Sequence, residues 1–383
     1  MSQGLEPRRP WRGWARHTAA LALLGAGCPA GRCGRGTAEP GPLSEEERRA
    51  IPPGVIALSE EERRAIPGVI AFISERATQK DVWLVKPTGE ERQLTKSPEE
   101  DDFTSAPAPD GKALLVIATR TVEERHYEQL RLQPLDGSAP VPLNVPRARA
   151  RNASWSPDGR WFVAESDAQS FSDLVKLEPR AGTAEQRLTS VREGCFQPDV
   201  SPDGREIAFV SSREGDPEIY VMRADGTGER RITAFHQEDR EPRWSPDGKW
   251  LTFISGREGR ERYFLVRPDG TQLRAVSGGA TKLDERQLVW SPDSQKVAFV
   301  ERLPDAKSRI WVARVEGGEP VALTDGKTLD DEPAWSPDGK YLVFVAAREG
   351  DTDLWLMRAD GSGQTRLTTA KGADWLPRWF VPR

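Results

Sequence analysis

Short hydrophobic runs bounded by polar turns recur along most of the chain. Segments 206–210 and 341–345, for example, are rich in Ile, Val, Leu and Phe and follow turns that contain Pro, Asp and Gly. Runs of this length and composition between turn residues are typical of β-strands. The hydrophobic pattern from residue 69 onward therefore predicts an all-β protein.

One pentapeptide, Trp-Ser-Pro-Asp-Gly, divides these strands into periods. It is complete at 155–159, 244–248 and 335–339, altered at 200–204 and 290–294, and reduced to a remnant at 107–111 and at Trp379. Its first position falls at 107, 155, 200, 244, 290, 335 and 379, a spacing of 44 to 48 residues. Pro presets φ for a turn and Gly tolerates positive φ, so the pentapeptide predicts a tight turn between two strands.

Each period holds four predicted strands, and radial repetition of four-stranded sheets makes a β-propeller. The first period, with strands near 69–73, 82–85 and 92–95, lacks a first strand, while 376–380 is a first strand alone. We expect these pieces to form one sheet that closes a ring of seven blades and removes free strand edges. Six blades are the alternative.

Aromatic residues recur at two points of the period. We expect them to form the core between blades rather than a ligand-stacking surface. They are Trp155, Trp244, Trp290, Trp335 and Trp379 in the first strands, and Trp83, Tyr220, Phe264, Trp311 and Trp355 in the third.

Composition narrows the range of partners. Of the 383 residues, 30% are charged and 37% hydrophobic, and the net charge is −5. Because no long basic stripe is present, we expect no nucleic-acid partner. The three cysteines, Cys28, Cys33 and Cys195, do not suggest a disulfide framework, and we expect a monomer.

The N-terminal region has the features of an exported protein. Residues 1–28 combine four arginines with a short apolar run, too short to span a bilayer, and end in Leu-Gly-Ala-Gly-Cys. This ending resembles a bacterial lipobox, in which Cys28 is lipidated. We therefore expect a lipid anchor in the periplasm or at the outer membrane; ordinary cleaved secretion and a start without export are the alternatives.

Residues 29–68 are predicted to be a flexible tether. They contain a tandem copy, 43–57 followed by 58–71, in which LSEEERRAIP occurs twice. Ser59 and Glu62 have the spacing of a capping box, which predicts a short helical turn. The propeller is expected to occupy 69–383.

The repeat motifs identify a family resemblance. Trp-Ser-Pro-Asp-Gly, then Phe-x-Ser-x-Arg-Glu-Gly (209–215 and 253–259), then Met-Arg-Ala-Asp-Gly (222–226 and 357–361), resemble the propeller of the TolB family of the periplasmic Tol–Pal system. They are also similar to propellers of the prolyl-oligopeptidase class. TolB-family proteins carry six blades and an N-terminal α/β domain, so this sequence is interpreted as a TolB-like propeller rather than as a Tol–Pal component.

Charged residues also recur with the period. The loops between the second and third strands repeat an arginine, and the segments that enter the first strands repeat carboxylates. The arginines are Arg76, Arg120, Arg213, Arg257, Arg302 and Arg348; the carboxylates are Asp101, Asp102, Glu238, Asp239, Asp284, Glu285, Asp330, Asp331 and Asp374. Both loop sets emerge at one face, where we expect Arg–carboxylate pairs. One interpretation is that these pairs tie neighbouring blades together. The other is that the arginines and carboxylates left without a pair face a partner peptide.

The third blade interrupts this pattern, with Glu165 and Asp167 at the arginine position and Cys195-Phe196-Gln197 at the acidic entry. An interruption in a ring is a candidate binding site. The predicted partner-binding face therefore consists of Glu165, Asp167, Phe196, Arg213, Arg257, Arg348, Asp239 and Asp331.

Catalytic motifs are not evident. The chain has three histidines, His17, His126 and His236, and no Gly-x-Ser-x-Gly. We expect no catalytic residues, metal site or cofactor. The leading hypothesis is a non-enzymatic envelope scaffold that binds a protein or peptide. The alternatives are a carbohydrate- or peptide-active enzyme that uses acidic residues of the central channel, and a purely structural envelope protein.

Overall fold

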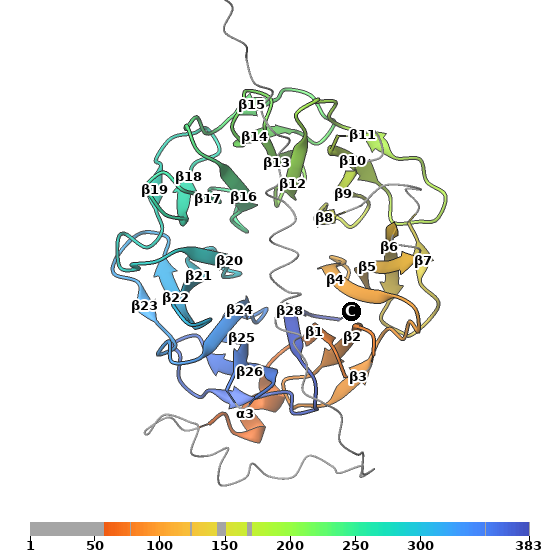
Figure 1. Ribbon diagram of the computed structural model, residues 1–383, viewed down its shortest axis with the longest axis vertical. Coiled ribbons are helices and arrows are strands. Elements are labelled where there is room, and N and C mark those ends of the chain that lie inside the picture. Colours follow the sequence, from red (N-terminus) through yellow and green to blue (C-terminus); the bar gives the residue numbers. More distant parts are fainter. Residues whose placement is uncertain are drawn as a thin grey trace, which may run out of the picture. The chain divides into compact units, whose positions relative to one another are not determined.

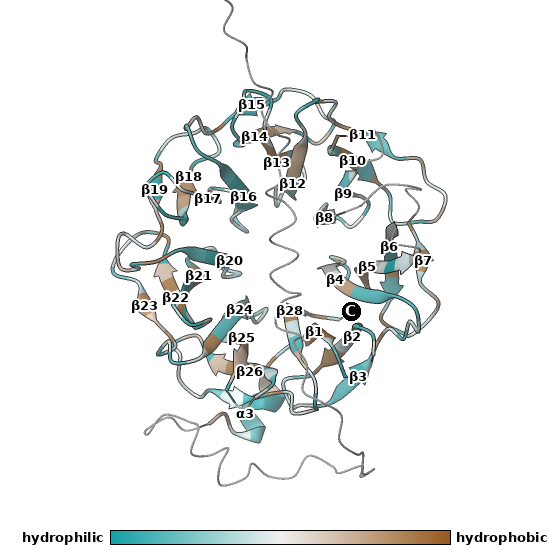
Figure 2. Cartoon of the chain, in the orientation of Figure 1, coloured by the Kyte–Doolittle hydropathy of each residue, from teal (hydrophilic) through white to brown (hydrophobic). Residues whose placement is uncertain are grey.

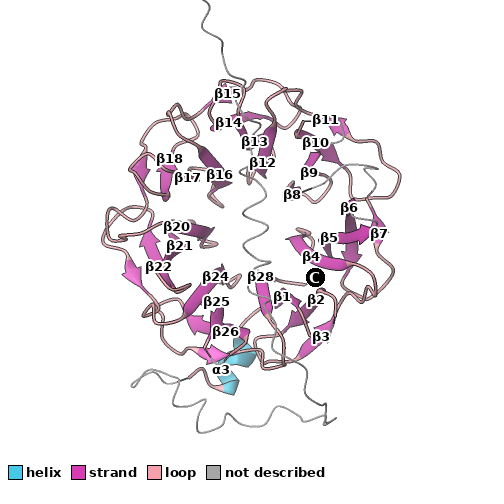
Figure 3. Cartoon of the chain, in the orientation of Figure 1, coloured by secondary structure: helices cyan, strands magenta, loops and turns pink. Residues whose placement is uncertain are grey.

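The computed structural model describes residues 57–76, 78–122, 125–143, 151–166, 171–348 and 350–382. These residues form seven four-stranded antiparallel sheets around a central axis (Figure 1). One short helix, α3 (Glu60–Ala65), accompanies them in the described part of the chain (Figure 3). The fold is thus a seven-bladed β-propeller, as predicted, and not the six-bladed alternative.

The strands follow one another blade by blade around the ring. Their bounds are β1 (Val69–Ser74), β2 (Asp81–Val85), β3 (Glu91–Gln93), β4 (Asp101–Pro107), β5 (Ala113–Val122), β6 (Arg125–Pro134), β7 (Val141–Pro142), β8 (Arg151–Trp155), β9 (Phe162–Ser166), β10 (Asp173–Leu177), β11 (Gln186–Arg187), β12 (Cys195–Val200), β13 (Glu206–Ser211), β14 (Glu218–Arg223), β15 (Arg230–Arg231), β16 (Asp239–Trp244), β17 (Leu251–Ser255), β18 (Arg262–Val266), β19 (Arg274–Ala275), β20 (Glu285–Trp290), β21 (Lys296–Arg302), β22 (Ser308–Arg314), β23 (Val321–Ala322), β24 (Leu329–Trp335), β25 (Tyr341–Ala347), β26 (Thr352–Arg358), β27 (Thr365–Arg366) and β28 (Asp374–Phe380).

The two ends of the propeller share one blade. Its strand order is β28-β1-β2-β3, so a strand from the C-terminal end lies innermost beside strands from the N-terminal end. Val69 pairs with Phe380 and Ser74 with Asp374 along the antiparallel ladder. The predicted closure of the ring is therefore confirmed.

The repeated pentapeptide forms a self-contained turn. In the copy that begins at Trp335, Ser336 Oγ donates to Asp338 Oδ1 at 2.6 Å and accepts from the backbone N–H of Tyr341 at 2.9 Å. The N–H of Gly339, at φ 70°, donates to the Ser336 carbonyl. The Ser, Asp and Gly of the motif thus all take part in hydrogen bonds of this turn, which precedes the second strand of a blade.

The core lies between blades, where the second and third strands are most hydrophobic (Figure 2). Cross-strand pairs such as Phe344 opposite Trp355 are fully or nearly fully buried. The first-strand tryptophans reach the preceding blade: the indole N–H of Trp244 donates to the Asp199 carbonyl at 3.1 Å. The aromatic positions are thus inter-blade core, as predicted.

Helix α3 packs on the β24–β27 blade. Ser59 is its N-cap and accepts from the Glu62 N–H, as the capping-box spacing predicts. Leu58 and Ile66 flank the helix and are buried against Leu356. The last residues of the predicted tether are therefore folded against the propeller.

Candidate functional site

Three blades contain the same arrangement around an arginine, which we call the arginine stack. In the β16–β19 blade, Arg257 lies over the rings of Phe253 and Phe264, with its guanidinium carbon 5.1 and 4.8 Å from the ring centres. Its Nη2 also donates to Asp239 Oδ2 at 2.6 Å. A planar guanidinium suits this geometry because it stacks on rings and bonds carboxylates in its own plane.

The other stacks repeat this geometry with their own residues. Arg348 lies 4.4 Å from the ring centre of Trp355 and bonds Asp330 at 3.0 Å, and Arg76 lies 4.7 Å from that of Trp83 and bonds Asp374 at 2.9 Å. Each carboxylate belongs to the first strand of the arginine's own blade. The expectation that these pairs tie neighbouring blades together is therefore wrong, because the loop and the strand entry that carry them meet within one sheet.

A different pair does connect two blades. Arg286 of β20 donates to Asp331 of β24 at 2.6 Å. Asp331 is 8% exposed, and burial raises its pKa although Arg286 opposes that rise. Of the predicted partner-binding residues, Arg257, Arg348, Asp239 and Asp331 thus all have partners inside the propeller.

The third-blade interruption is also built into the protein. Cys195 takes the place of the stack carboxylate and lies 3.9 Å from Nη2 of Arg213, which bonds Glu229. Burial raises the pKa of the Cys195 thiol. Phe196 next to it is half-buried. Arg213 thus has an ion-pair partner on the surface side of its blade instead of a buried carboxylate.

Glu165 is 3% exposed and bonds residues of the first strands of two blades, β8 and β12. It accepts from the Gln197 N–H at 2.5 Å and from Asn152 Nδ2 at 2.8 Å. Asp167 lies outside the described residues. The described members of the predicted face therefore lie in four blades, and the structure pairs Arg257 with Asp239 but does not gather the members into one patch.

The first strands, which lie closest to the axis (Figure 1), contain a feature that the sequence analysis missed. Each first strand has a β-bulge where it pairs with the second strand. In six of them the structure records a non-glycine residue with φ between 47° and 56° at this point: Asn152, Gln197, Glu241, Gln287, Glu332 and Leu376. We call these the bulge residues.

The bulge residues connect adjacent blades. The Glu241 N–H donates to Gln197 Oε1 at 2.8 Å, and the Glu332 N–H donates to Gln287 Oε1 at 3.1 Å. In the same way, the Leu376 N–H donates to Glu332 Oε2 at 2.5 Å. A bulge frees one N–H from the ladder, and the side chain of the preceding blade accepts it. The sequence did contain a signal for these bulges. Three positions before the repeated Trp there is usually a residue whose side chain can accept a hydrogen bond, and Pro often follows it.

Charged groups gather beside this ring of bulges. Arg243 of β16 and Arg378 of β28 stand one residue before Trp244 and Trp379 and are partly exposed. Burial lowers the pKa of Arg378, Glu332 opposes this, and Arg243 lowers it further. The positive charge of Arg243 acts on Arg378 although two blades separate their strands along the ring, and both strands are among the first strands that lie closest to the axis (Figure 1).

Glu332 is the most perturbed carboxyl in this region. Burial and the neighbouring Asp331 raise the pKa of Glu332 to about 7, against the Leu376 N–H, which lowers it. A carboxyl with such a pKa exchanges its proton near neutrality.

The described residues include no cluster of His, Cys, Asp and Glu suited to a metal ion, and none of their helices is long and apolar enough to cross a membrane.

Comparison with known proteins agrees with this repeat architecture. The family model of the TolB beta propeller domain matches residues 116–289 and 287–382. The chain belongs to this family. Among curated relatives, an uncharacterized protein of Agrobacterium fabrum is 31% identical over 106 residues, which cover 26% of this chain and 36% of that protein.

The Tol-Pal system protein TolB of Anaeromyxobacter dehalogenans is 30% identical over 101 residues, 25% of this chain and 23% of that protein. The matches therefore span well under half the length of these curated relatives.

Solved structures that share the TolB-like fold include proteins with different activities. TolB from Acinetobacter baumannii superimposes with a TM-score of 0.53 at 20% identity, over 85% of this chain and 87% of that one. An oligogalacturonate lyase from Vibrio parahaemolyticus gives 0.58 at 16% identity, over 80% and 87%. A puromycin hydrolase gives 0.61 at 17% identity, over 87% and 55%. At these identities the likeness shows the fold alone.

Proposed function

We propose that this TolB-like propeller is a non-enzymatic scaffold of the cell envelope that binds a protein or peptide at the inner ends of its first strands. One observation carries the proposal. Arg243 and Arg378 belong to two of the first strands, β16 and β28, and neither forms an ion pair with a described residue. Among the described residues, each side chain donates one hydrogen bond, to the carbonyl of its own preceding proline, at 3.1 and 3.2 Å.

Partly desolvated guanidiniums that form no ion pair with a described carboxylate are suited to an incoming acidic group, because charge-assisted bonds to carboxylates are among the strongest that a protein offers. The surrounding wall is rigid, since bulge residues bond blade to blade and arginine stacks lock the loops above them. A preorganised wall lowers the entropic cost of ordering a bound peptide. We therefore expect the partner segment to carry Asp, Glu or a terminal carboxylate.

The test is capture from a solubilised envelope fraction with the purified protein as bait. We expect at least one protein to be retained by wild type and by an R180Q/R205Q control, and to be lost with R243Q/R378Q. The control removes the same number of charges, because Arg180 and Arg205 have side chains that are 71% and 85% exposed. Equal retention by both double variants would disprove the proposed site. If the captured protein is lost only with R243Q/R378Q, it is purified and its affinity for wild type is measured directly.

Envelope location rests on the signal-like N-terminus and on similarity to a protein named for the Tol-Pal system. We infer that Cys28, which lies outside the described residues, carries the lipid anchor, with no other contact to the membrane. Incorporation of labelled fatty acid that persists in Cys28→Ala would exclude this anchor.

An enzymatic role is the second candidate, and Glu332 is the observation that favours it. A carboxyl with a pKa of about 7 beside Asp331 has the proton affinity of a general acid. Turnover of a glycan or peptide panel that disappears in Glu332→Gln, with folding intact, would establish it. No turnover by wild type would leave the scaffold as the better account.

A further inference from the structure

The β4–β7 blade departs from its sisters where an arginine stack would lie. Asp102 of β4 pairs with Ala118 as Asp239 pairs with Ser255, so it occupies the stack carboxylate's position. Arg120, two residues after Ala118, corresponds to Arg257. It does not reach Asp102, and its guanidinium carbon lies 5.6 Å from the ring centre of Tyr127 instead.

Two local substitutions explain why no stack forms. The ring pair Phe253 and Phe264 of the β16–β19 blade is replaced by the cross-strand pair Val116 and Arg131. In addition, β5 continues to Val122, so Arg120 remains inside a regular ladder instead of turning back in a loop. Without rings beneath it, and held in the strand, the arginine cannot fold over the carboxylate.

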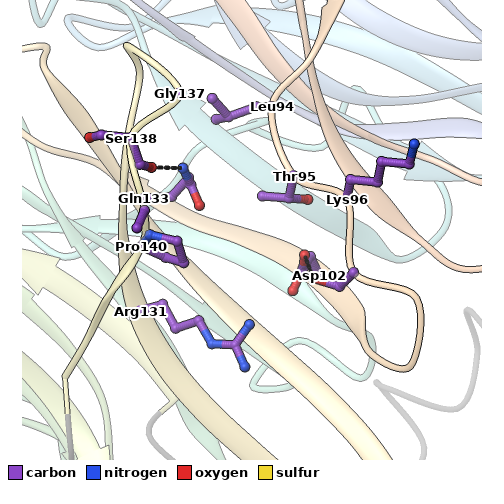
Figure 4. A pocket seen from close by; sticks show the side chains of 11 residues that line it. Leu94, Thr95, Lys96, Asp102, Arg131, Gln133, Gly137, Ser138 and Pro140 are labelled. Atoms are coloured by element: carbon purple, nitrogen blue, oxygen red, sulfur yellow. Dashed lines mark hydrogen bonds between the residues drawn. The ribbon is translucent and has the colours of Figure 1, made fainter.

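A cavity of about 190 Å³ lies at this place. Its wall includes Thr95 to Ser97 of the connection between β3 and β4, Asp102, Arg131 and Gln133, and the turn 137–140 (Figure 4). In the β16–β19 blade the matching connection supplies Phe235, which lies 5.1 Å from the guanidinium carbon of Arg257. Three parts of the cavity wall, the β3–β4 connection, β4 and β6, thus correspond to parts of the sister blade that contact the Arg257 guanidinium, while Gln133 and the turn 137–140 complete the wall.

Asp102 is a buried carboxylate that, unlike Asp239 and Asp374, forms no ion pair with a described arginine. It is 2% exposed; Oδ2 accepts from Ser97 Oγ at 2.8 Å, and no described donor reaches Oδ1. Asp239 and Asp374 also leave one oxygen without a donor, but their other oxygen bonds an arginine. The missing arginine, rather than the single free oxygen, distinguishes Asp102.

The cations nearest to Asp102 are engaged elsewhere. Arg131 donates to Glu100 and to Gln129 and forms no ion pair with Asp102. Lys96 is exposed and points away from the carboxylate (Figure 4). The volume is smaller than the roughly 300–1,000 Å³ of sites for drug-sized ligands and suits a single side chain.

We propose that this cavity binds the guanidinium of an arginine side chain presented by a peptide partner, in the place that Arg257 takes in the β16–β19 blade. The proposal rests on the proposed scaffold function and names a residue that its partner would carry. The acidic group expected at Arg243 and Arg378 and the arginine at Asp102 are then two contacts of one partner.

The test titrates the purified protein with blocked Gly-Arg-Gly, the same tripeptide with citrulline in place of arginine, and methylguanidine, using calorimetry. Citrulline keeps the shape and removes the charge. We expect the arginine tripeptide to bind wild type at least about tenfold more tightly than the citrulline tripeptide, which corresponds to about 1.4 kcal/mol. Equal binding of the two tripeptides, or no binding of either, would overturn the proposal. Methylguanidine binding as tightly as the arginine tripeptide would overturn its peptide part.

Variants locate the site. Asp102→Asn keeps the side-chain size and is expected to abolish the preference for arginine, whereas Asp110→Asn, an exposed carboxylate in the β4–β5 turn of the same blade, should leave it unchanged. Ala139→Trp changes only an exposed rim residue and should block the cavity even if Asp102→Asn misfolds. Arginine binding that survives both Asp102→Asn and Ala139→Trp would place the site elsewhere. Because these probes need no partner, failure here leaves the envelope-capture result unaffected.

Discussion

The closing strand offers the most direct test of how the ring is held together. Phe380 is 8% exposed and packs with Val69 of its own blade and with Leu114 and Val116 of the next blade. Removing a buried Phe side chain costs roughly 3–5 kcal/mol, from lost burial and the remaining cavity. That is a large part of the roughly 5–15 kcal/mol by which native proteins are stable.

The perturbation is Phe380→Ala, with Val381→Ala as its control, since Val381 is the next residue and is 44% exposed. The unfolding entropy is about 2.1 cal/mol/K per residue, and we apply it to residues 57–382. Each kcal/mol of lost stability then lowers Tm by roughly 1.5 °C, so we expect Tm to fall by about 4–8 °C. Val381→Ala should stay within about 0.5 kcal/mol of wild type. Tm is measured by circular dichroism, and the free energy of unfolding by urea titration. Equal shifts in both variants would refute the placement of β28 in the composite blade.

Three further perturbations address the other interactions. Arg348→Met leaves the buried Asp330 carboxylate unpaired and should lower the free energy of unfolding by roughly 3–5 kcal/mol, measured in urea, with partial recovery when Asp330→Asn is added. Because the folded pKa of Glu332 is raised to about 7, the folded state holds the extra proton below that pH, so stability should decline as pH rises from about 5 to about 8. Glu332→Gln should reduce this decline, and an unchanged pH profile of the urea midpoint would contradict it. Leu58→Ala should cost roughly 2–5 kcal/mol, while Leu43→Ala, the same change in the first tandem copy, should not alter the urea midpoint.

The architecture could be predicted because the repeat encodes it locally. The polar groups of the Ser-Pro-Asp-Gly turn form hydrogen bonds within the turn and to the residue that follows it. The sequence of the turn alone therefore indicates where the second strand of a blade begins. The composite blade also followed from the sequence, since a missing first strand at one end matched a solitary one at the other. Family resemblance agreed with the propeller fold but implied six blades rather than the seven observed.

The charge pattern was harder to interpret because periodicity gives position but not partner. The recurrence of Arg257 and Asp239 correctly indicated pairing, yet sequence spacing could not reveal that the loop folds back onto its own sheet. The bulge residues were missed for a similar reason. A left-handed residue such as Glu332 is not a type that marks turns, and its role depends on an N–H in the next blade.

Departures from the repeat are more informative about binding than the repeat itself. Where Arg257 closes over Phe264 and Asp239, the charge is neutralised inside the blade and leaves little for a partner. Where Val116 and Arg131 replace the rings and β5 continues to Val122, Asp102 is left without its arginine. The shared register makes each sister blade a physical control for the altered one, because corresponding positions can be compared although β5 is longer than β17. The double substitution Val116→Phe and Arg131→Tyr should therefore close the cavity and remove arginine binding while Asp102 stays in place.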